Sequence, residues 1–229
     1  MSIFKDKQAE MQKMLMSAVH FGHYTNKWNP KMKQFIWGQR KNVHVFDLNK
    51  TLEHLEGALT YLKSLLDDKK SILFVATKQQ ATGVIQKIAD DLDMPYVTNK
   101  WIPGLLTNFS TVSTRVNELK KLKRMRDEGE FDKYTKKEAS GFKKTINKLQ
   151  GALGGVESMD KLPDCLFVLD INRDKTAVVE ARKKGIPVVA IVDSNSDPDL
   201  VDYGIPGNDD AIKSINYFLD TIKTHLTQK

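Results

Sequence analysis

The sequence has almost no cysteine, no long hydrophobic stretch and, over one long segment, no acidic residue. Cys165 is the single cysteine among 229 residues, so an internal disulfide bond is excluded. It lies in the apolar run CLFVL, which favours a buried, inert thiol and a reducing compartment. No run of 18 apolar residues occurs, so no membrane-spanning helix is predicted. The first residues are charged and mixed in sign, which is typical of neither a secretory signal nor a transit peptide.

Acidic residues are absent between Glu10 and Asp47. Inside this gap, the stretch HFGHYTNKWNPKMKQFIWGQRK at residues 20–41 mixes aromatic rings with lysine and arginine. Cationic groups bind phosphates, while ring faces and asparagine amides contact exposed bases, so this mixture favours RNA as the partner. Pro30 and Gly38 predict an irregular loop that follows an RNA surface.

The basic charge is concentrated in two blocks. Residues 1–50 hold nine Lys or Arg and three Asp or Glu, and residues 112–150 hold twelve and six. Residues 51–111 hold six bases and seven acids, and residues 151–229 hold nine and thirteen. The formal net charge of +7 therefore comes from two segments, as expected for a chain that contacts a polyphosphate with two surfaces.

Short apolar runs alternate with helical patterns outside these blocks. Strands are predicted at 71–77, 94–98, 165–170, 186–193 and near 203–205, and helices at 79–92, 175–185 and 209–226. Continuous apolar runs are typical of strands buried on both faces. The alternation therefore predicts an α/β/α sandwich around a five-stranded parallel sheet.

Residues 112–150 interrupt this order. Apolar residues recur there at spacings of three and four on both sides of Gly129, and Thr135 to Glu138 has the spacing of a capping box. The pattern predicts two antiparallel helices packed along one seam. We therefore divide the chain into an N-terminal helix with a basic aromatic segment (1–50), an α/β core (51–111 and 154–229) and an inserted coiled-coil hairpin (112–153).

Enzymatic signatures are missing from the sequence. The turn KQQATG after the first core strand has neither a G-x-G-x-x-G fingerprint nor a P-loop, and no G-x-S-x-G elbow occurs. The segment DSNSDPDLVDYG lacks the glycine and glutamate of a calcium loop, and fits better as a loop at the carboxyl end of a strand. The residues therefore predict no catalytic site and no small-molecule substrate.

Four blocks resemble the small-subunit ribosomal protein S2 family, of bacterial or organellar type. They are VHFGHYTNKWNPKMKQFIWGQRKNVHVFDLNKT, ILFVATKQQA, KWIPGLLTNFSTV, and the segment from LPDCLFVLDINRDKT to GIPGNDDAI. The resemblance implies a flavodoxin-like fold with a protruding hairpin and a non-enzymatic role between the head and body of the small subunit. It also implies ribosomal RNA, neighbouring small-subunit proteins and the large messenger-binding ribosomal protein as partners, on a bacterial cytoplasmic or an organellar ribosome.

Candidate RNA-binding residues come from both basic blocks and from the KWIPGLLTNF block. Lys100 and Pro103 depart from the usual Arg and Gly of that family block, and a lysine cannot make the bidentate phosphate contact of arginine. The candidates are Lys27, Trp28, Asn29, Lys31, Lys33, Arg40, Lys41, Lys100, Trp101, Asn108, Arg115 and Lys143.

No cofactor is required, although magnesium is expected through the RNA and a structural zinc ion is one hypothesis. Asp193 ends the strongest strand, and Asp209 and Asp210 open the last helix, so all three are expected at the same sheet edge. With His23 they would form a mixed nitrogen and oxygen site, which zinc accepts. The alternative is that the aspartates cap a helix and a loop while His23 binds RNA or backbone.

Two other functions fit the same fold. One is an enzyme that binds a nucleotide or sugar phosphate, and the other is a free module that binds a protein through the hairpin. The paired basic blocks without a phosphate loop favour the RNA-binding ribosomal protein over both.

Overall fold

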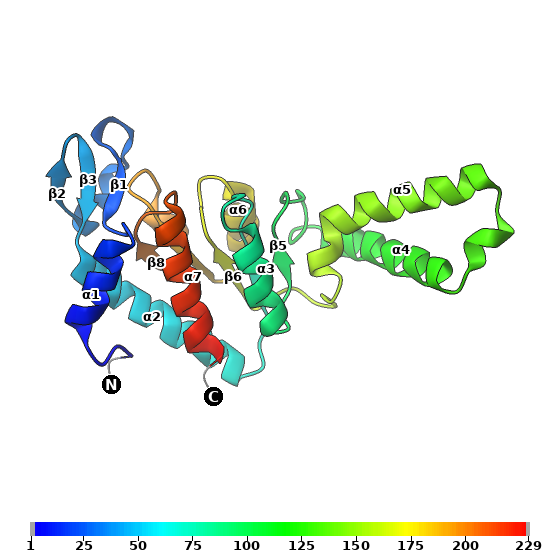
Figure 1. Cartoon of the computed structure of the whole chain (residues 1–229), viewed down its shortest axis with the longest axis horizontal. Helices are drawn as coiled ribbons and strands as arrows, with labels where there is room; N and C mark the ends of the chain where they lie inside the picture. The colour runs from blue at the N-terminus through cyan, green and yellow to red at the C-terminus, as the bar shows by residue number, and fades with distance from the viewer. Residues whose placement is uncertain (1–2, 228–229) are drawn as a thin grey trace.

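The computed structural model describes residues 3–227 and contains a central parallel sheet with extensions at both ends (Figure 1). The sheet order is β5-β4-β6-β7-β8, and all neighbours are parallel. This is the flavodoxin-like order 2-1-3-4-5, so the predicted fold is confirmed. The strands are β4 (Ile72–Val75), β5 (Tyr96–Val97), β6 (Cys165–Val168), β7 (Val188–Val192) and β8 (Tyr203–Pro206).

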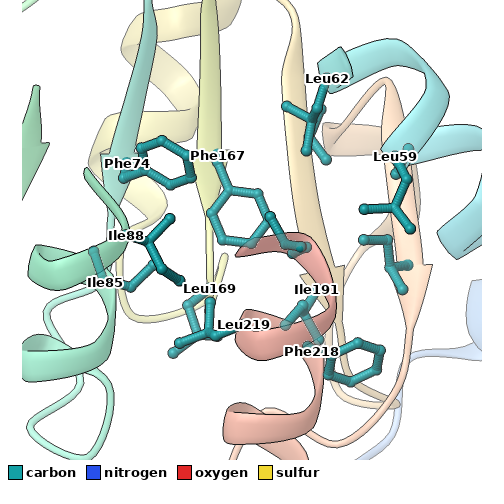
Figure 2. Close-up of a cluster of buried hydrophobic side chains, with 14 of the residues drawn as sticks. Leu59, Leu62, Phe74, Ile85, Ile88, Phe167, Leu169, Ile191, Phe218 and Leu219 are labelled. Carbon is teal, nitrogen blue, oxygen red and sulfur yellow. The ribbon is translucent and has the colours of Figure 1, made fainter. Parts of the chain in front are cut away.

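Helices cover both faces of this sheet. On one face lie α1 (Lys7–Met16), α2 (Leu48–Asp67), α3 (Thr82–Asp91) and α7 (Ile212–Thr227). Figure 2 shows side chains of α2, α3 and α7 gathered near Phe74 and Phe167. On the other face, α6 (Lys175–Lys183) packs with residues 101–106 against Leu73, Val75 and their neighbours. Alternate residues of each strand therefore enter two separate cores, which explains why the strands are apolar throughout. No helix within residues 3–227 combines the length and hydrophobicity needed to cross a membrane.

The hairpin consists of α4 (Phe109–Asp127) and α5 (Lys136–Leu153), which project beyond the β5 edge of the sheet (Figure 1). The predicted capping box is present, because Thr135 Oγ1 accepts from the Glu138 N–H and the Glu138 carboxylate accepts from the Thr135 N–H. Leu119, Phe131 and Ile146 form a separate hydrophobic cluster in the outer part. Val112 and Val116 instead pack into the core of the α6 face. The base of the hairpin is thus continuous with the core.

The predicted loop at residues 20–41 is wrong at its two ends, because nine of its 22 residues are folded into strands. β1 (Phe21–Tyr24), β2 (Ile36–Arg40) and β3 (Val43–Phe46) form an antiparallel sheet of order β1-β3-β2. Lys41 and Asn42 both have positive φ, at 49° and 61°, and so form a tight hairpin turn between β2 and β3. Residues 25–35 between these strands are irregular, with the 3₁₀ helices Thr25–Lys27 and Pro30–Phe35, so the loop interpretation holds there.

Candidate nucleic-acid interface

Four predicted cations of the N-terminal segment are exposed and unpaired. Lys27 precedes Trp28, Lys33 lies in the 3₁₀ helix, and Arg40 and Lys41 border the β2–β3 turn. None of the four has an ion-pair partner within the part of the chain that the structure describes. Such groups are available to phosphates without first breaking an internal contact.

Lys31 differs from these four residues. Its Nζ lies 2.8 Å from Asp197 Oδ2 and 2.8 Å from Asp199 Oδ2. Hydrogen bonds to these carboxylates raise the pKa of Lys31. The pair is exposed, so it contributes little to stability, but it directs Lys31 toward the core loop rather than toward solvent. To contact a phosphate as predicted, Lys31 must therefore leave Asp197 and Asp199.

Lys31 and Lys33 also border an open depression of about 660 Å³. Gln34, Ile36, Lys50 and Asp199 complete its lining. Three lysines at one concave site raise the local positive potential, and Asp199 offsets part of it.

Trp28 and Asn29 have structural contacts of their own. The Trp28 ring is half-buried, and its centroid lies 4.8 Å from that of His44. Asn29 Oδ1 accepts from the Lys31 N–H at 3.0 Å, and the Asn29 N–H donates to Ser194 O at 2.7 Å. Asn29 therefore caps the 3₁₀ helix and joins it to the core. Its side-chain NH₂ group stays available to a base or a 2′-hydroxyl.

The prediction that Trp101 contacts RNA is not supported, because its side chain is 6% exposed. The Trp101 indole N–H donates to Glu180 Oε1 at 3.0 Å. The Glu180 carboxylate also accepts from the backbone N–H groups of Gly104, Leu106 and Thr107. Burial alone would raise the pKa of Glu180, but these donors outweigh it and lower the pKa. Trp101 and Glu180 thus fix the loop that leads into α4.

Lys100 and Asn108 lie at the two ends of that fixed loop, and both are exposed. Asn108 Oδ1 accepts from Thr111 Oγ1 at 3.0 Å at the start of α4. In the hairpin, Arg115 Nη1 lies 2.8 Å from Glu118 Oε2, whereas Lys143 is exposed and unpaired within the described residues. The structure therefore distributes these four candidates between the hairpin base and its α5 side.

The four residues of the zinc hypothesis lie together at the carboxyl edge of the sheet. His23 Nδ1 lies 3.0 Å from Asp193 Oδ1, and His23 Nε2 lies 3.3 Å from Asp210 Oδ2. The Asp209 N–H donates to Asp193 Oδ2 at 3.2 Å. This convergence links the N-terminal sheet to the ends of β7 and β8.

Lys78, which follows β4, provides a positive charge in this cluster. Its Nζ lies 2.7 Å from Asp209 Oδ1, 2.7 Å from Asp210 Oδ1 and 2.9 Å from Asp170 Oδ2. Burial alone would lower the pKa of Lys78, but the three carboxylates outweigh it and raise the pKa. The hydrogen bond to Asp193 likewise raises the pKa of His23. Burial, together with Asp193 and Asp170, raises the pKa of Asp209 to about 8.

One imidazole and several carboxylates are groups that suit a metal ion, but the Lys78 ammonium already neutralises the carboxylates. Within residues 3–227, no group of three or more His, Cys, Asp or Glu side chains is arranged to hold a metal. A zinc ion bound to Asp209 and Asp210 would have to compete with the Lys78 ammonium for the same oxygens. Zinc binding therefore stays a prediction.

Sequence reasoning missed Lys78, Asp170, Ser194 and Glu180. The first three follow β4, β6 and β7, and the carboxyl ends of parallel strands meet at one sheet edge. Because each of them follows an apolar run, the sequence could have placed all three at that edge. Glu180 had no such signal, because its partners lie more than 70 residues away in the chain.

The chain is similar to known proteins over nearly its whole length. The family model described as ribosomal protein S2 matches residues 14–228. The chain is 47% identical to the small ribosomal subunit protein uS2 of Helicobacter hepaticus, over 93% of this chain and 80% of that protein. It is 45% identical to the uS2 protein of Aliarcobacter butzleri, over 95% and 82%, and 47% identical to that of Pseudoalteromonas atlantica, over 92% and 87%.

Proposed function

Since the chain belongs to the ribosomal protein S2 family, we propose that it is a structural part of the small ribosomal subunit and binds the ribosomal RNA there with its two basic blocks. The relatives are ribosomal proteins rather than enzymes, in agreement with the predicted non-enzymatic role. The observation that carries the RNA assignment is the set of exposed, unpaired cations Lys27, Lys33, Arg40 and Lys41.

The charge at the sheet edge argues against the enzyme alternative. A nucleotide or sugar phosphate would bind a flavodoxin-like fold outside the carboxyl ends of its strands. In this chain Asp170, Asp193, Asp209 and Asp210 lie at that edge and would repel phosphate. The single lysine there, Lys78, is surrounded by three of these acids.

The test replaces the four unpaired cations with Ala and measures rebinding of the full chain to small subunits that lack it, across a potassium chloride series. Affinity falls as salt rises, and each lost phosphate contact reduces the steepness of log affinity against log salt by about 0.7 to 0.9. We therefore expect a decrease of about three units. The control replaces Lys175, Lys183, Lys184 and Lys213, which are exposed and unpaired on the core.

An equal slope for wild type and the four-cation variant would contradict the RNA contact. Sedimentation provides the broader test, because the proposal requires the protein to travel with small subunits. Bacterial relatives support a bacterial cytoplasmic ribosome, with an organellar ribosome as the alternative. Which neighbouring proteins it touches, including the large messenger-binding protein, also stays a prediction.

Zinc is the remaining part of the proposal. Metal analysis of the purified protein, compared with His23→Ala, tests whether His23, Asp193, Asp209 and Asp210 retain an ion. Equal zinc content in the two proteins would contradict a site that uses His23.

A further inference from the structure

The two helices of the hairpin differ in how their positive charges are used. In α4, five of the six basic side chains lie within 4.0 Å of an acid, and the exception is Lys121. Two of these acids, Glu157 and Asp160, come from the segment that follows α5. The pairs are Arg115–Glu118, Lys120–Asp160, Lys123–Glu157, Arg124–Glu128 and Arg126–Asp127. The charge of α4 is therefore largely neutralised within the chain.

In α5 no basic side chain is neutralised in this way. The helix carries five exposed lysines, and none has an ion-pair partner among residues 3–227. Its single acid, Glu138, is engaged with Thr135 in the capping box. The five are Lys136, Lys137, Lys143, Lys144 and Lys148. The positive excess of the hairpin is therefore concentrated on α5.

Helical geometry places these lysines relative to the seam. With about 100° between successive residues, Lys137, Lys144 and Lys148 lie on one line, opposite the side where Phe142 and Ile146 pack. This line is about 16 Å long at 1.5 Å per residue. Lys136 and Lys143 lie about 100° to 120° around the helix from this line. We call Lys137, Lys144 and Lys148 the α5 ridge.

Ser140 and Gly141, which lie nearest this line between Lys137 and Lys144, are both small. Gly141 is exposed in the middle of the helix, and a Cβ atom there would meet no atom within 4 Å. Packing within the chain therefore does not require this glycine, and glycine weakens a helix interior relative to alanine. It does allow the backbone of a partner to approach the helix closely.

We propose that the α5 ridge binds the sugar–phosphate backbone of double-helical RNA, while α4 carries little of the contact. This inference rests on the proposed function. Lysine ammonium groups neutralise phosphates as point charges without reading bases. The ridge presents no aromatic ring on which an unpaired base could stack, which favours a duplex over a single strand.

The experiment compares two triple variants of the full chain in the same salt series of small-subunit rebinding. Lys137→Ala, Lys144→Ala and Lys148→Ala remove the ridge, and Lys120→Ala, Arg124→Ala and Arg126→Ala remove three paired charges of α4. We expect the slope of log affinity against log salt to fall by about two to three units for the ridge variant. For the α4 variant we expect a change well below one unit. Helix content from circular dichroism checks that both hairpins are folded.

Equal decreases for the two variants, or no decrease for the ridge variant, would overturn the inference. The N-terminal four-cation variant separates this failure from that of the proposed function. If it lowers the slope and the ridge variant does not, RNA binding stands and the ridge assignment falls. If wild type does not rebind to subunits at all, the proposed function itself fails.

Gly141→Gln provides a readout that does not depend on charge. The substitution should stabilise α5 but weaken rebinding several-fold, because a side chain would separate the ridge from the RNA backbone. Gly57→Gln is the matched control, since Gly57 is exposed in α2 and a Cβ there also meets no atom within 4 Å. Unchanged rebinding for Gly141→Gln would contradict a close approach at the ridge.

Discussion

The two basic blocks lie at opposite ends of the molecule and are attached to the core in different ways (Figure 1). In the N-terminal sheet, the backbone N–H groups of His23 and Asn29 both donate to Ser194 at 2.7 Å. Met32, Phe35 and Phe46 enter the same hydrophobic core as β4 and β6. The outer hairpin, residues 119–146, has instead a hydrophobic cluster of its own.

This difference predicts different mechanical roles for the two surfaces. The N-terminal sheet is fixed to the carboxyl edge of the core, so its cations keep a defined orientation relative to that edge. The outer hairpin packs around its own hydrophobic cluster and contacts the segment after α5 through the ion pairs Lys120–Asp160 and Lys123–Glu157, so it acts as an arm whose position depends on the hairpin base. Perturbing the sheet edge should therefore affect the N-terminal block and the core together, and leave the outer hairpin folded.

The largest loss of unfolding free energy is expected for Lys78→Ala. Removing this ammonium leaves the buried Asp209, whose side chain is 3% exposed, beside Asp170 and Asp193 without the cation that neutralises them. Breaking a buried pair by removing one partner costs about 3 to 5 kcal/mol of unfolding free energy. Urea denaturation measures the loss, and hydrogen exchange should show the outer hairpin unchanged.

Lys223→Ala is the control for this prediction. Lys223 Nζ lies 2.6 Å from Asp91 Oδ2, but both side chains are partly exposed. Such a pair contributes at most about 1 kcal/mol. Equal losses for Lys78→Ala and Lys223→Ala would mean that the cluster at the sheet edge does not support the core.

A smaller effect is expected for Gly22→Ala in β1. An added Cβ would lie 2.6 Å from Ser194 Oγ, at the contact that joins the N-terminal sheet to the core. Overpacking of this kind costs about 1 to 3 kcal/mol. Gly38→Ala in β2 is the matched control, because a Cβ there meets no atom within 4 Å. Thermal unfolding that is identical for the two variants would contradict the proposed attachment.

The next prediction concerns how stability changes with pH. The N-terminal block contains the buried His44, whereas the hairpin contains no histidine. Both ring nitrogens of His44 are buried without a hydrogen-bond partner in the described residues, and burial lowers its pKa below the ordinary value of 6.5. The unfolded chain therefore binds this proton more readily, so stability falls as pH decreases below about 6.5. His44→Phe should remove this part of the pH dependence.

The measurement is the difference in unfolding free energy between His44→Phe and wild type, which we expect to grow in favour of the variant from pH 7.5 to pH 5. Other titrating groups cancel in this difference. The hairpin residues 109–153 contain no histidine, so their hydrogen exchange should show no matching change. A difference that is constant with pH would show that His44 is not buried in its neutral form.

The core could be predicted because its signals are local. ILFV, CLFV and VVAIV are apolar on both faces, and Thr135 with Glu138 marks the start of α5 within four residues. The N-terminal sheet could not, because its strands mix polar and apolar residues and β1 pairs with β3, where Phe21 lies opposite Val45. Its turn also places Lys41 at positive φ, where glycine, asparagine or aspartate is usual.

The site was predicted in part for the same reason. The ends of β7 and β8 indicated that Asp193, Asp209 and Asp210 would meet, since parallel strands end at one edge. The sequence gives no local sign that Lys78 sits among these acids, because the contact with Asp209 spans 131 positions. Trp101 was an RNA-binding candidate as part of the KWIPGLLTNF block, whereas a hydrogen bond to Glu180 holds its ring inside.

The smallest effect on the core is expected from removing the outer hairpin. Excision of residues 118–147, with a short Gly/Ser bridge, removes Leu119, Phe131 and Ile146 together and leaves the core residues Val112 and Val116 in place. We expect the core to melt cooperatively, with its unfolding free energy changed by about 1 kcal/mol, because the excision removes the ion pairs Lys120–Asp160 and Lys123–Glu157 and pairs near the surface contribute little. Excision of 112–150 should cost several times more, because each buried valine contributes about 1.5 to 3 kcal/mol. If the shorter excision abolishes cooperative melting, the hairpin is part of the core along its whole length and the contrast between the two basic blocks is lost.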